Sequence, residues 1–301
     1  MSLLPICLIG CGRWGSLILR DLKSLGCEVS VVEHNEESKL NARRVGADKV
    51  FASIEEVVEA RGFVVATPTV THGRVVESLL DRNLPIFVEK PFTDDYESAA
   101  RIADIAGDRV FVMDKWRYHT GILKLAEIAK SGLLGPVKGL KTTRTQHGQP
   151  HHDVDSVWIL LPHDLSIALE IFGHVPRPVH AVGAGTSMGL TDLFSICGEN
   201  PWHVSEISTR HAVSRREVWL YCRDGVAHLD DSYSEQITIT RDNVDASIEK
   251  VSFLQEMPLL AELKAFINHV EGGPSPKSSA RHGAEIVGCI EQLRSRAMKN
   301  L

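Results

Sequence analysis

The fold of this 301-residue chain is decided by its first stretch, Pro5-Ile6-Cys7-Leu8-Ile9 followed by Gly10-Cys11-Gly12-Arg13-Trp14-Gly15. The five apolar residues are too few for a core helix and rich in branched side chains, which is typical of a buried parallel strand. A helical pattern of apolar residues follows as far as Gly26. A strand, glycines at the first, third and sixth positions, and then a helix form the layout that binds the pyrophosphate of a dinucleotide.

Each glycine of this loop has its own expected role. Gly10 permits a tight turn, Gly12 lets the backbone approach the phosphates, and Gly15 lets helix and strand pack closely. The phosphates would lie on the free N–H groups at the positive end of the helix dipole. Arg13 and Trp14 belong to the same loop and complete this part of the predicted cofactor site.

A carboxylate follows the second expected strand. Glu33 stands at the end of residues 28–32, 18 positions after Gly15, and His34 is next to it. A carboxylate at this place accepts hydrogen bonds from both ribose hydroxyls and repels a 2′-phosphate. The sequence therefore predicts NAD rather than NADP as the cofactor.

Strand and helix patterns alternate through the first part of the chain, with further strands expected over 49–51, 63–66, 85–88 and 110–113. This alternation predicts a parallel, doubly wound Rossmann sheet with ligands beyond the carboxyl ends of its strands. From about residue 179, turn-linked strands predict an open, mostly antiparallel sheet before two closing helices. We therefore predict an α/β protein with an NAD-binding domain over 1–118 and a substrate-binding α+β domain over 119–301.

Two local signals predict where helices begin. Ser53-Ile54-Glu55-Glu56 has the form of a capping box that opens a helix. Thr93 is expected to cap another helix that runs to Ala106, with two aspartates favourably placed in its first turn.

The loop after the fourth strand is placed to pass under the adenosine and the nicotinamide ribose. This makes its residues candidates for cofactor binding: Ala66, Thr67, Pro68 and His72. The same residues are explained equally well without a cofactor, by a threonine N-cap followed by a proline at the start of a helix.

The fifth strand runs into Glu89-Lys90-Pro91, which puts Lys90 at the mouth of the expected cleft. A lysine there can hydrogen-bond a substrate hydroxyl and help its proton leave, provided that burial or a neighbour tunes its pKa. Glu89 and Lys90 are also candidate cofactor contacts. Lys115 and Arg117 follow the sixth strand and are candidate substrate contacts. Two charged side chains that are simply exposed to solvent would give the same sequence.

Three motifs resemble those of the Gfo/Idh/MocA family of NAD(P)-dependent sugar and cyclitol dehydrogenases. In chain order they are Gly10 to Gly15, Ala66 to Thr69 with His72, and Glu89-Lys90-Pro91. The closing segment, from Ala261 to Pro274, is similar to that of the family as well. The resemblance implies a sugar-like substrate. It also implies a homo-oligomer, dimer or tetramer, formed through the C-terminal open sheet.

A second chemical stretch lies in the expected helix over 157–172, where Pro162 is predicted to kink or restart the helix just before His163. A neutral imidazole with a pKa near its usual value of about 6.5 can accept or donate a substrate proton. A histidine that is merely hydrogen-bonded in an interdomain helix is the alternative. The family resemblance implies a histidine followed by aspartate near the nicotinamide, which makes His163 catalytic and Trp158 and Asp164 candidate substrate contacts.

One position departs from the family pattern. Family dehydrogenases commonly carry an aspartate four residues before this histidine, and this chain has Ile159 there. Isoleucine neither orients an imidazole nor relays a proton. Lys90 and His163 then act alone, or Asp155 or Asp164 substitutes, or the usual reaction is lost.

The segment Gln146-His147-Gly148-Gln149-Pro150-His151-His152-Asp153 is rich in histidine. Adjacent histidines rarely reach one tetrahedral site together, so we expect a polar loop at the substrate mouth and no metal.

The bulk composition excludes several classes of protein. A net charge of −6 gives no basic footprint for nucleic acid, and no apolar run is long enough to cross a bilayer. A strand begins within four residues of Met1, which predicts no signal peptide. The six cysteines form no C-x-x-C pair, which predicts a reduced, cytoplasmic protein.

The leading functional hypothesis is an NAD-dependent dehydrogenase that moves a hydride between the nicotinamide and a carbinol carbon of a sugar, cyclitol or nucleotide sugar. It assumes that the loops around Cys11 and Pro162 face one cleft. The alternatives are an NAD-binding regulatory protein without turnover, favoured by Ile159, and an imine or enone reductase on the same scaffold.

Overall fold

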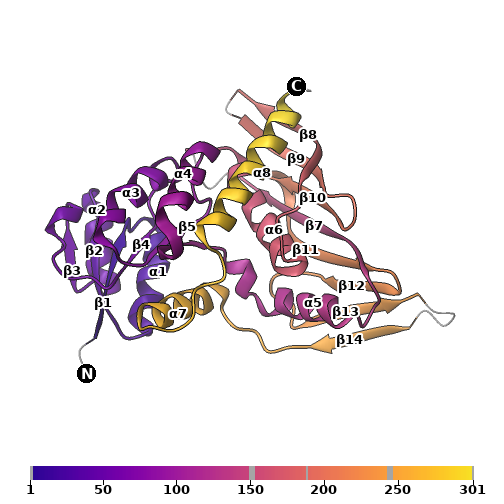
Figure 1. Ribbon diagram of the computed structural model, residues 1–301, viewed down its shortest axis with the longest axis horizontal. Coiled ribbons are helices and arrows are strands. Elements are labelled where there is room, and N and C mark those ends of the chain that lie inside the picture. Colours follow the sequence, from indigo (N-terminus) through magenta and orange to yellow (C-terminus); the bar gives the residue numbers. More distant parts are fainter. Residues whose placement is uncertain (1–2, 149–152, 188, 243–246, 300–301) are drawn as a thin grey trace. The chain divides into compact units, whose positions relative to one another are not determined.

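The computed structural model describes residues 3–148, 153–187, 189–242 and 247–299 (Figure 1). The chain divides into two compact units. One contains the N-terminal part up to Asp114 together with Leu259–Val287, and the other contains Lys115–Pro258 together with the chain from Gly288 onward. The chain therefore leaves the first unit, builds most of the second, returns to the first over Leu259–Val287, and then re-enters the second.

The first unit is built on a parallel sheet of six strands in the order β3-β2-β1-β4-β5-β6 (Figure 1). Its strands are β1 (Leu4–Ile9), β2 (Cys27–Val32), β3 (Lys49–Phe51), β4 (Gly62–Val65), β5 (Ile86–Glu89) and β6 (Val110–Met113). This is the Rossmann strand order, and the predicted fold class is confirmed. The order reverses between β1 and β4, so the two strand ends that frame the crevice of such a sheet belong to β1 and β4.

Helices α1 (Arg13–Ser24), α2 (Glu36–Val45), α3 (His72–Leu79) and α4 (Tyr96–Ala106) connect these strands. The capping-box signal was a wrong prediction, because Ile54–Glu56 forms one 3₁₀ turn and no α-helix follows it. The predicted cap of α4 was also wrong. Asp95 is the N-cap and accepts a hydrogen bond from the Ser98 N–H at 2.7 Å, while the Thr93 hydroxyl donates to the Asp95 carbonyl.

A helix from the end of the chain completes the core of the first unit. The ring of Phe266 in α7 (Pro258–Val270) stacks on the ring of Phe87 in β5, with 5.0 Å between centroids. Leu263 and Val270 belong to the same apolar cluster as the strand residues. Burial of an aromatic side chain of this size contributes a few kcal/mol to folding, about 3–5 kcal/mol by truncation. The Rossmann sheet of this chain therefore depends on residues far from it in sequence.

The second unit is built on a sheet of eight strands in the order β14-β13-β12-β11-β7-β10-β9-β8. Its strands are β7 (Val137–His147), β8 (Pro178–Thr186), β9 (Gly189–Cys197), β10 (Trp202–Ser208), β11 (Arg210–Cys222), β12 (Gly225–Leu229), β13 (Gln236–Arg241) and β14 (Ile248–Ser252). Every neighbouring pair is antiparallel except β7 and β10, which are parallel. The predicted open, mostly antiparallel sheet is thus confirmed.

Helices α5 (Thr120–Ser131) and α6 (Ser156–Phe172) pack on one face of this sheet, and α8 (Ala280–Met298) ends beside β8. The helix α6 does not restart at Pro162 but runs through it. Because almost the whole of α6 is buried, tertiary packing outweighs the single backbone hydrogen bond that proline removes. The edge strand β14 was not predicted, since its sequence, IEKVS, is exposed and lacks an apolar alternation.

Candidate active site

The glycine loop after β1 is held by very close backbone contacts. A Cβ on Gly10, whose φ is +87°, would lie 2.7 Å from the Ala66 carbonyl oxygen, and one on Gly15 would lie 2.3 Å from the Gly10 oxygen. Only glycine fits at these two positions. At Gly12 an added Cβ would meet no described protein atom within 4 Å. Gly12, the second glycine, therefore borders open space, where the sequence predicts the phosphates.

The start of α1 suits an anionic group. Gly12 is the N-cap and supplies no side-chain hydrogen bond, and the first turn, which the structure describes in full, carries no acidic residue. The orphan N–H groups and the positive end of the helix dipole are left for a ligand. Arg13 is exposed and Trp14 is half-buried beside this turn. The loop thus fits a dinucleotide diphosphate.

Glu33 ties the end of β2 to the glycine loop. Its Oε2 accepts a hydrogen bond from the Cys11 N–H at 2.8 Å, and its Oε1 accepts from the N–H groups of His34 and Asn35 at 2.8 and 3.0 Å. The His34 side chain is exposed. Three backbone donors hold the Glu33 carboxylate at the strand end, where the ribose of a dinucleotide is bound in Rossmann folds.

The loop after β4 and the loop after β5 are joined through one imidazole. His72 is 1% exposed, and its Nδ1 and Nε2 lie 2.8 Å from the carbonyl oxygens of Pro91 and Thr67. His72 therefore positions both loops. Ala66 backs the glycine loop, and Pro68 is exposed ahead of the 3₁₀ turn Thr69–Thr71.

Lys90 follows the buried strand β5 directly and is half-buried, while Glu89 is buried. The Pro91 carbonyl held by His72 is one residue further along the chain. The backbone that carries Lys90 is thus anchored on both sides, by the sheet and by an imidazole. This anchoring suits a side chain that has to meet a substrate in one place.

In the second unit, almost the whole of α6 is buried. Every residue of the fully described segment Ser156–Ile171 is buried except His163. Its neighbour Trp158, a predicted substrate contact, is only 6% exposed. A half-exposed imidazole on an otherwise buried helix is rigidly held and open to a reacting group, as a general acid or base must be.

Trp116 is the centre of the side chains around His163. Its ring lies 6.4 Å from the ring of His163 and stacks on that of His119 at 5.0 Å, while the Arg144 guanidinium lies 4.4 Å above it. Burial lowers the pKa of His119, and the nearby charge of Arg144 adds to that effect. Sequence reasoning missed Trp116 and Arg144. The available signal for Arg144 was its position in the strand pattern, in which it alternates with Leu140 and Thr142.

Two of the predicted substrate contacts are engaged within the protein. The Arg117 guanidinium pairs with Glu170 at 3.0 Å, and both residues are almost fully buried. Asp164, 1% exposed, accepts hydrogen bonds from Arg144 at 2.9 Å. Lys115 is half-buried in the same 3₁₀ turn as Arg117.

The two acids proposed to substitute for the aspartate missing before His163 both have other partners within the protein. Asp155 caps α6, accepting from Val157 N–H, and also accepts from Leu190 N–H and from Arg294 at 2.7 Å. Asp164 pairs with Arg144. Ile159, one turn before His163, is 5% exposed and apolar. Substitution by Asp155 or Asp164 therefore stays one of three alternatives.

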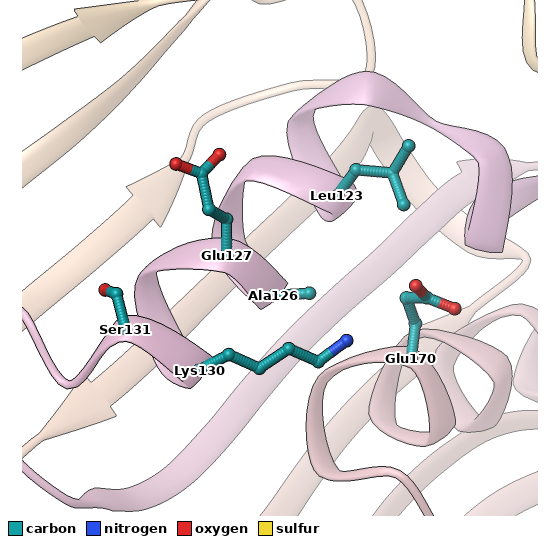
Figure 2. A pocket seen from close by; sticks show the side chains of 6 residues that line it. All are labelled: Leu123, Ala126, Glu127, Lys130, Ser131 and Glu170. Carbon is teal, nitrogen blue, oxygen red and sulfur yellow. The ribbon is translucent and has the colours of Figure 1, made fainter.

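An open hollow of about 450 Å³ lies between α5 and α6 (Figure 2). Its lining includes Glu127 and Lys130 of α5 and Glu170 of α6, and it contains none of the site residues predicted from the sequence. Of the histidine-rich loop over 146–153, positions 149–152 lie outside the described residues. Within the part of the chain that the structure describes, no group of acidic, histidine or cysteine side chains is arranged to hold a metal.

A Rossmann sheet with an open glycine loop, followed by an open-sheet unit that carries a half-exposed histidine, defines a two-domain dinucleotide-binding oxidoreductase fold. Residues 4–112 match the model of the oxidoreductase family with an NAD-binding Rossmann fold, GFO_IDH_MocA. This segment is thus a Gfo/Idh/MocA-type NAD-binding domain, which confirms the resemblance and NAD as the cofactor. No helix in the described residues has the length and apolarity to span a membrane.

Two proteins illustrate the similarity, one of them also through a solved structure. UDP-N-acetylglucosamine 3-dehydrogenase of Acidithiobacillus ferrooxidans is 28% identical over 62% of this chain and 59% of its own. The rhizopine catabolism protein MocA of Rhizobium meliloti is 34% identical over 42% of this chain and 43% of its own. The chain thus spans about half the length of these relatives. A solved structure of the Acidithiobacillus ferrooxidans enzyme covers 99% of both chains with a TM-score of 0.85 at 22% identity, which shows a shared fold.

The open space at Gly12 yields a direct test of cofactor binding. We expect Gly12→Val to fold with only a small loss of melting temperature, because a Cβ there meets no described protein atom within 4 Å and the N-cap changes from glycine to the less favourable valine. The substituent would occupy the space of the diphosphate and lower the affinity for NADH about tenfold or more. Titration of NADH fluorescence measures the affinity. Unchanged NADH binding in a folded Gly12→Val variant would contradict the placement of the phosphates.

Proposed function

We propose that this protein is an NAD-dependent oxidoreductase that transfers a hydride between the nicotinamide and a carbinol carbon of a sugar, cyclitol or nucleotide sugar. The observation that carries the proposal is His163, a half-exposed residue in the middle of the otherwise buried segment Ser156–Ile171, in a chain whose first unit contains an NAD-binding oxidoreductase domain. The family members UDP-N-acetylglucosamine 3-dehydrogenase and inositol 2-dehydrogenase support a polyhydroxylated substrate.

Each residue has one task in the proposed reaction. The α1 N-terminus and Gly12 hold the diphosphate, and Glu33 accepts hydrogen bonds from the ribose hydroxyls. When bound, NAD supplies the carbon that accepts the hydride. Lys90 hydrogen-bonds the substrate oxygen, and His163 removes its proton in the oxidative direction or returns it in the reverse one. The Glu33 carboxylate disfavours the 2′-phosphate of NADP, so NAD is the preferred cofactor.

The second candidate function is an NAD-binding protein without turnover. Ile159 favours it, because an apolar residue stands one helical turn before His163, and Asp155 and Asp164 are paired with Arg294 and Arg144. Without a carboxylate, the imidazolium form of His163 loses one source of stabilisation.

We further propose that copies of the chain associate through the face of the second sheet opposite α5 and α6. Along this face Val182, Phe194 and Glu206 are aligned across β8, β9 and β10, and Ile196 lies beside Val204. The side chains of Val182, Phe194 and Ile196 are 43%, 51% and 41% exposed. Apolar side chains grouped on a sheet face are typical of a subunit interface.

Aromatic rings continue the same face over the neighbouring strands. Trp202 of β10 lies 5.2 Å from Tyr221 of β11, and Trp219 of β11 stacks on His228 of β12 at 3.4 Å. Tryptophan and tyrosine are enriched in interfaces. A dimer or a tetramer would cover them. A reducing compartment such as the cytoplasm suits the chain, since all six cysteines are unpaired and buried.

Removal of the proposed lysine contact should separate binding from catalysis. We expect Lys90→Met to lower kcat about 10²-fold or more, because the substrate oxygen loses its hydrogen-bond donor, with a smaller effect on NADH affinity. Steady-state kinetics with an active sugar and NADH titration of the same sample provide the two values. A variant that keeps the full kcat would show that Lys90 has no part in the reaction.

Restoration of the missing acid decides between the two candidate functions. In an active wild-type enzyme, Ile159→Asp should raise kcat about tenfold, because a carboxylate one turn away orients and stabilises the imidazolium of His163. Ile159→Asn is the matched control of equal size without charge. Turnover that appears only in Ile159→Asp, with an inactive wild type, would instead support the non-catalytic function.

A charge on the open sheet face should disrupt the proposed assembly. We expect Phe194→Glu to shift the mass measured by light scattering from that of an oligomer to that of a monomer, because a carboxylate in an apolar interface is left unpaired. Val58→Glu, on an exposed valine of the first unit, is the control and should leave the mass unchanged. A Phe194→Glu protein that remains oligomeric excludes this face as the interface.

A further inference from the structure

Two arginines lie directly opposite each other on the helix-covered side of the second sheet. Arg216 of β11 is in register with Arg144 of β7, and the next inward-facing pairs are Val218 with Thr142 and Leu220 with Leu140. Like charges in directly opposite positions of an antiparallel pair destabilise a sheet. Arg144 is 2% exposed and Arg216 is half-buried, so solvent screens their repulsion poorly.

Only one arginine of this pair forms an ion pair among the described residues. Asp164 Oδ1 accepts from Nε and Nη2 of Arg144 at 2.9 Å each. Arg216 donates only to uncharged oxygens: its Nη1 to the carbonyls of Thr145 and Arg215 at 2.6 Å, and its Nη2 to Gln146 Oε1 at 2.7 Å. Among the described residues no carboxylate lies within ion-pair distance of Arg216. The positive charge of Arg216 therefore has no direct counter-ion.

The lowered pKa of Arg216 reflects the unfavourable free energy of a positive charge in this position. Burial lowers the pKa of its guanidinium to about 10, and the charge of Arg144 is the next cause, while the charges of Asp164, Asp231 and Tyr233 act in the opposite direction. The group stays protonated at neutral pH. A half-buried positive charge that neighbouring strands do not neutralise is a costly feature, and such features concentrate at binding sites.

The pair is connected to the reacting histidine. The Arg144 guanidinium lies over the ring of Trp116, and the same ring is 6.4 Å from His163. Asp164, which holds Arg144, is the residue after His163 on α6. An anion bound to the two arginines would thus belong to the molecule that His163 meets.

We propose that Arg144 and Arg216 form an anion subsite that binds an oxyanion group of the substrate, either a carboxylate or a phosphate. This inference rests on the proposed function. It narrows the substrate from polyhydroxylated compounds in general to sugars that carry an acid, such as a uronic acid, a sugar phosphate or a nucleotide sugar. Arginine suits this role because its planar fork binds carboxylate and phosphate oxygens through two parallel hydrogen bonds. Arg216 is the specificity-determining residue, since Arg144 is already partly neutralised.

The test compares two adjacent arginines. Arg216→Gln removes the inward charge, and Arg215→Gln removes an equal charge from a side chain that is 49% exposed. Calorimetric titration in the presence of NADH measures binding of glucuronate, glucose 6-phosphate, UDP-glucose and the neutral controls glucose and myo-inositol. We expect at least one anionic ligand to bind wild type and Arg215→Gln equally within about twofold, and Arg216→Gln about tenfold more weakly. We expect the neutral sugars to be insensitive to both substitutions.

The outcomes separate this inference from the proposed function. Anionic ligands that bind in an Arg216-dependent way without any change in nicotinamide absorbance would support the subsite and contradict the oxidoreductase activity. Turnover of a neutral sugar with the same kcat/KM in wild type and Arg216→Gln, without preferential binding of any acid, would overturn the subsite and leave the activity intact. Equal losses in Arg216→Gln and Arg215→Gln would also overturn it, because they would indicate general attraction of anions. The preference between glucuronate and the two phosphate compounds identifies the oxyanion.

Discussion

The structure depends on a contact between backbone segments that is too close to leave room for a side chain. Gly10 turns the chain at the end of β1, Gly15 packs against the Gly10 carbonyl, and Ala66 at the end of β4 closes the same point from the other side. This contact brings the start of α1 up to the sheet edge with its N–H groups unused. Glu33 and His72 then fasten the loops around it. The cofactor site is therefore a consequence of close main-chain packing more than of any single functional side chain.

In the second unit, ion pairs fix the position of α6, the buried helix that carries the half-exposed imidazole of His163. The cap of α6 is fixed by the pairing of Asp155 with Arg294, and its middle by the pairing of Asp164 with Arg144. Both carboxylates are buried, so loss of the paired arginine would leave an uncompensated charge. The two pairs use the acids Asp155 and Asp164, which stand near His163 in sequence. In the proposed reaction, the apolar Ile159 leaves the proton transfer to His163 and Lys90.

Features set by short stretches of chain could be predicted from the sequence, and features set by distant partners could not. The strand β1, the glycine turn and Glu33 lie within about 30 residues, and each follows from local backbone requirements. The hydrogen bond from Arg294 to Asp155 joins residues 139 positions apart, so no local pattern indicates it. The same holds for Phe266, which completes a sheet that ends about 150 residues earlier. Thr93 and Asp95 were competing caps two residues apart, and sequence alone gives no basis for choosing between them.

The central claim, that this chain exchanges a hydride between NAD and an oxygen-bearing carbon, is tested most directly by nicotinamide absorbance. Wild-type protein is mixed with NAD and a set of sugars, cyclitols, sugar acids and nucleotide sugars, and with NADH and the corresponding ketones. We predict a change in absorbance with at least one member of the set, at a rate that falls about 10²-fold or more once Lys90 is replaced by methionine. A protein that binds NADH tightly and leaves the absorbance unchanged with every member, in both directions, would contradict it.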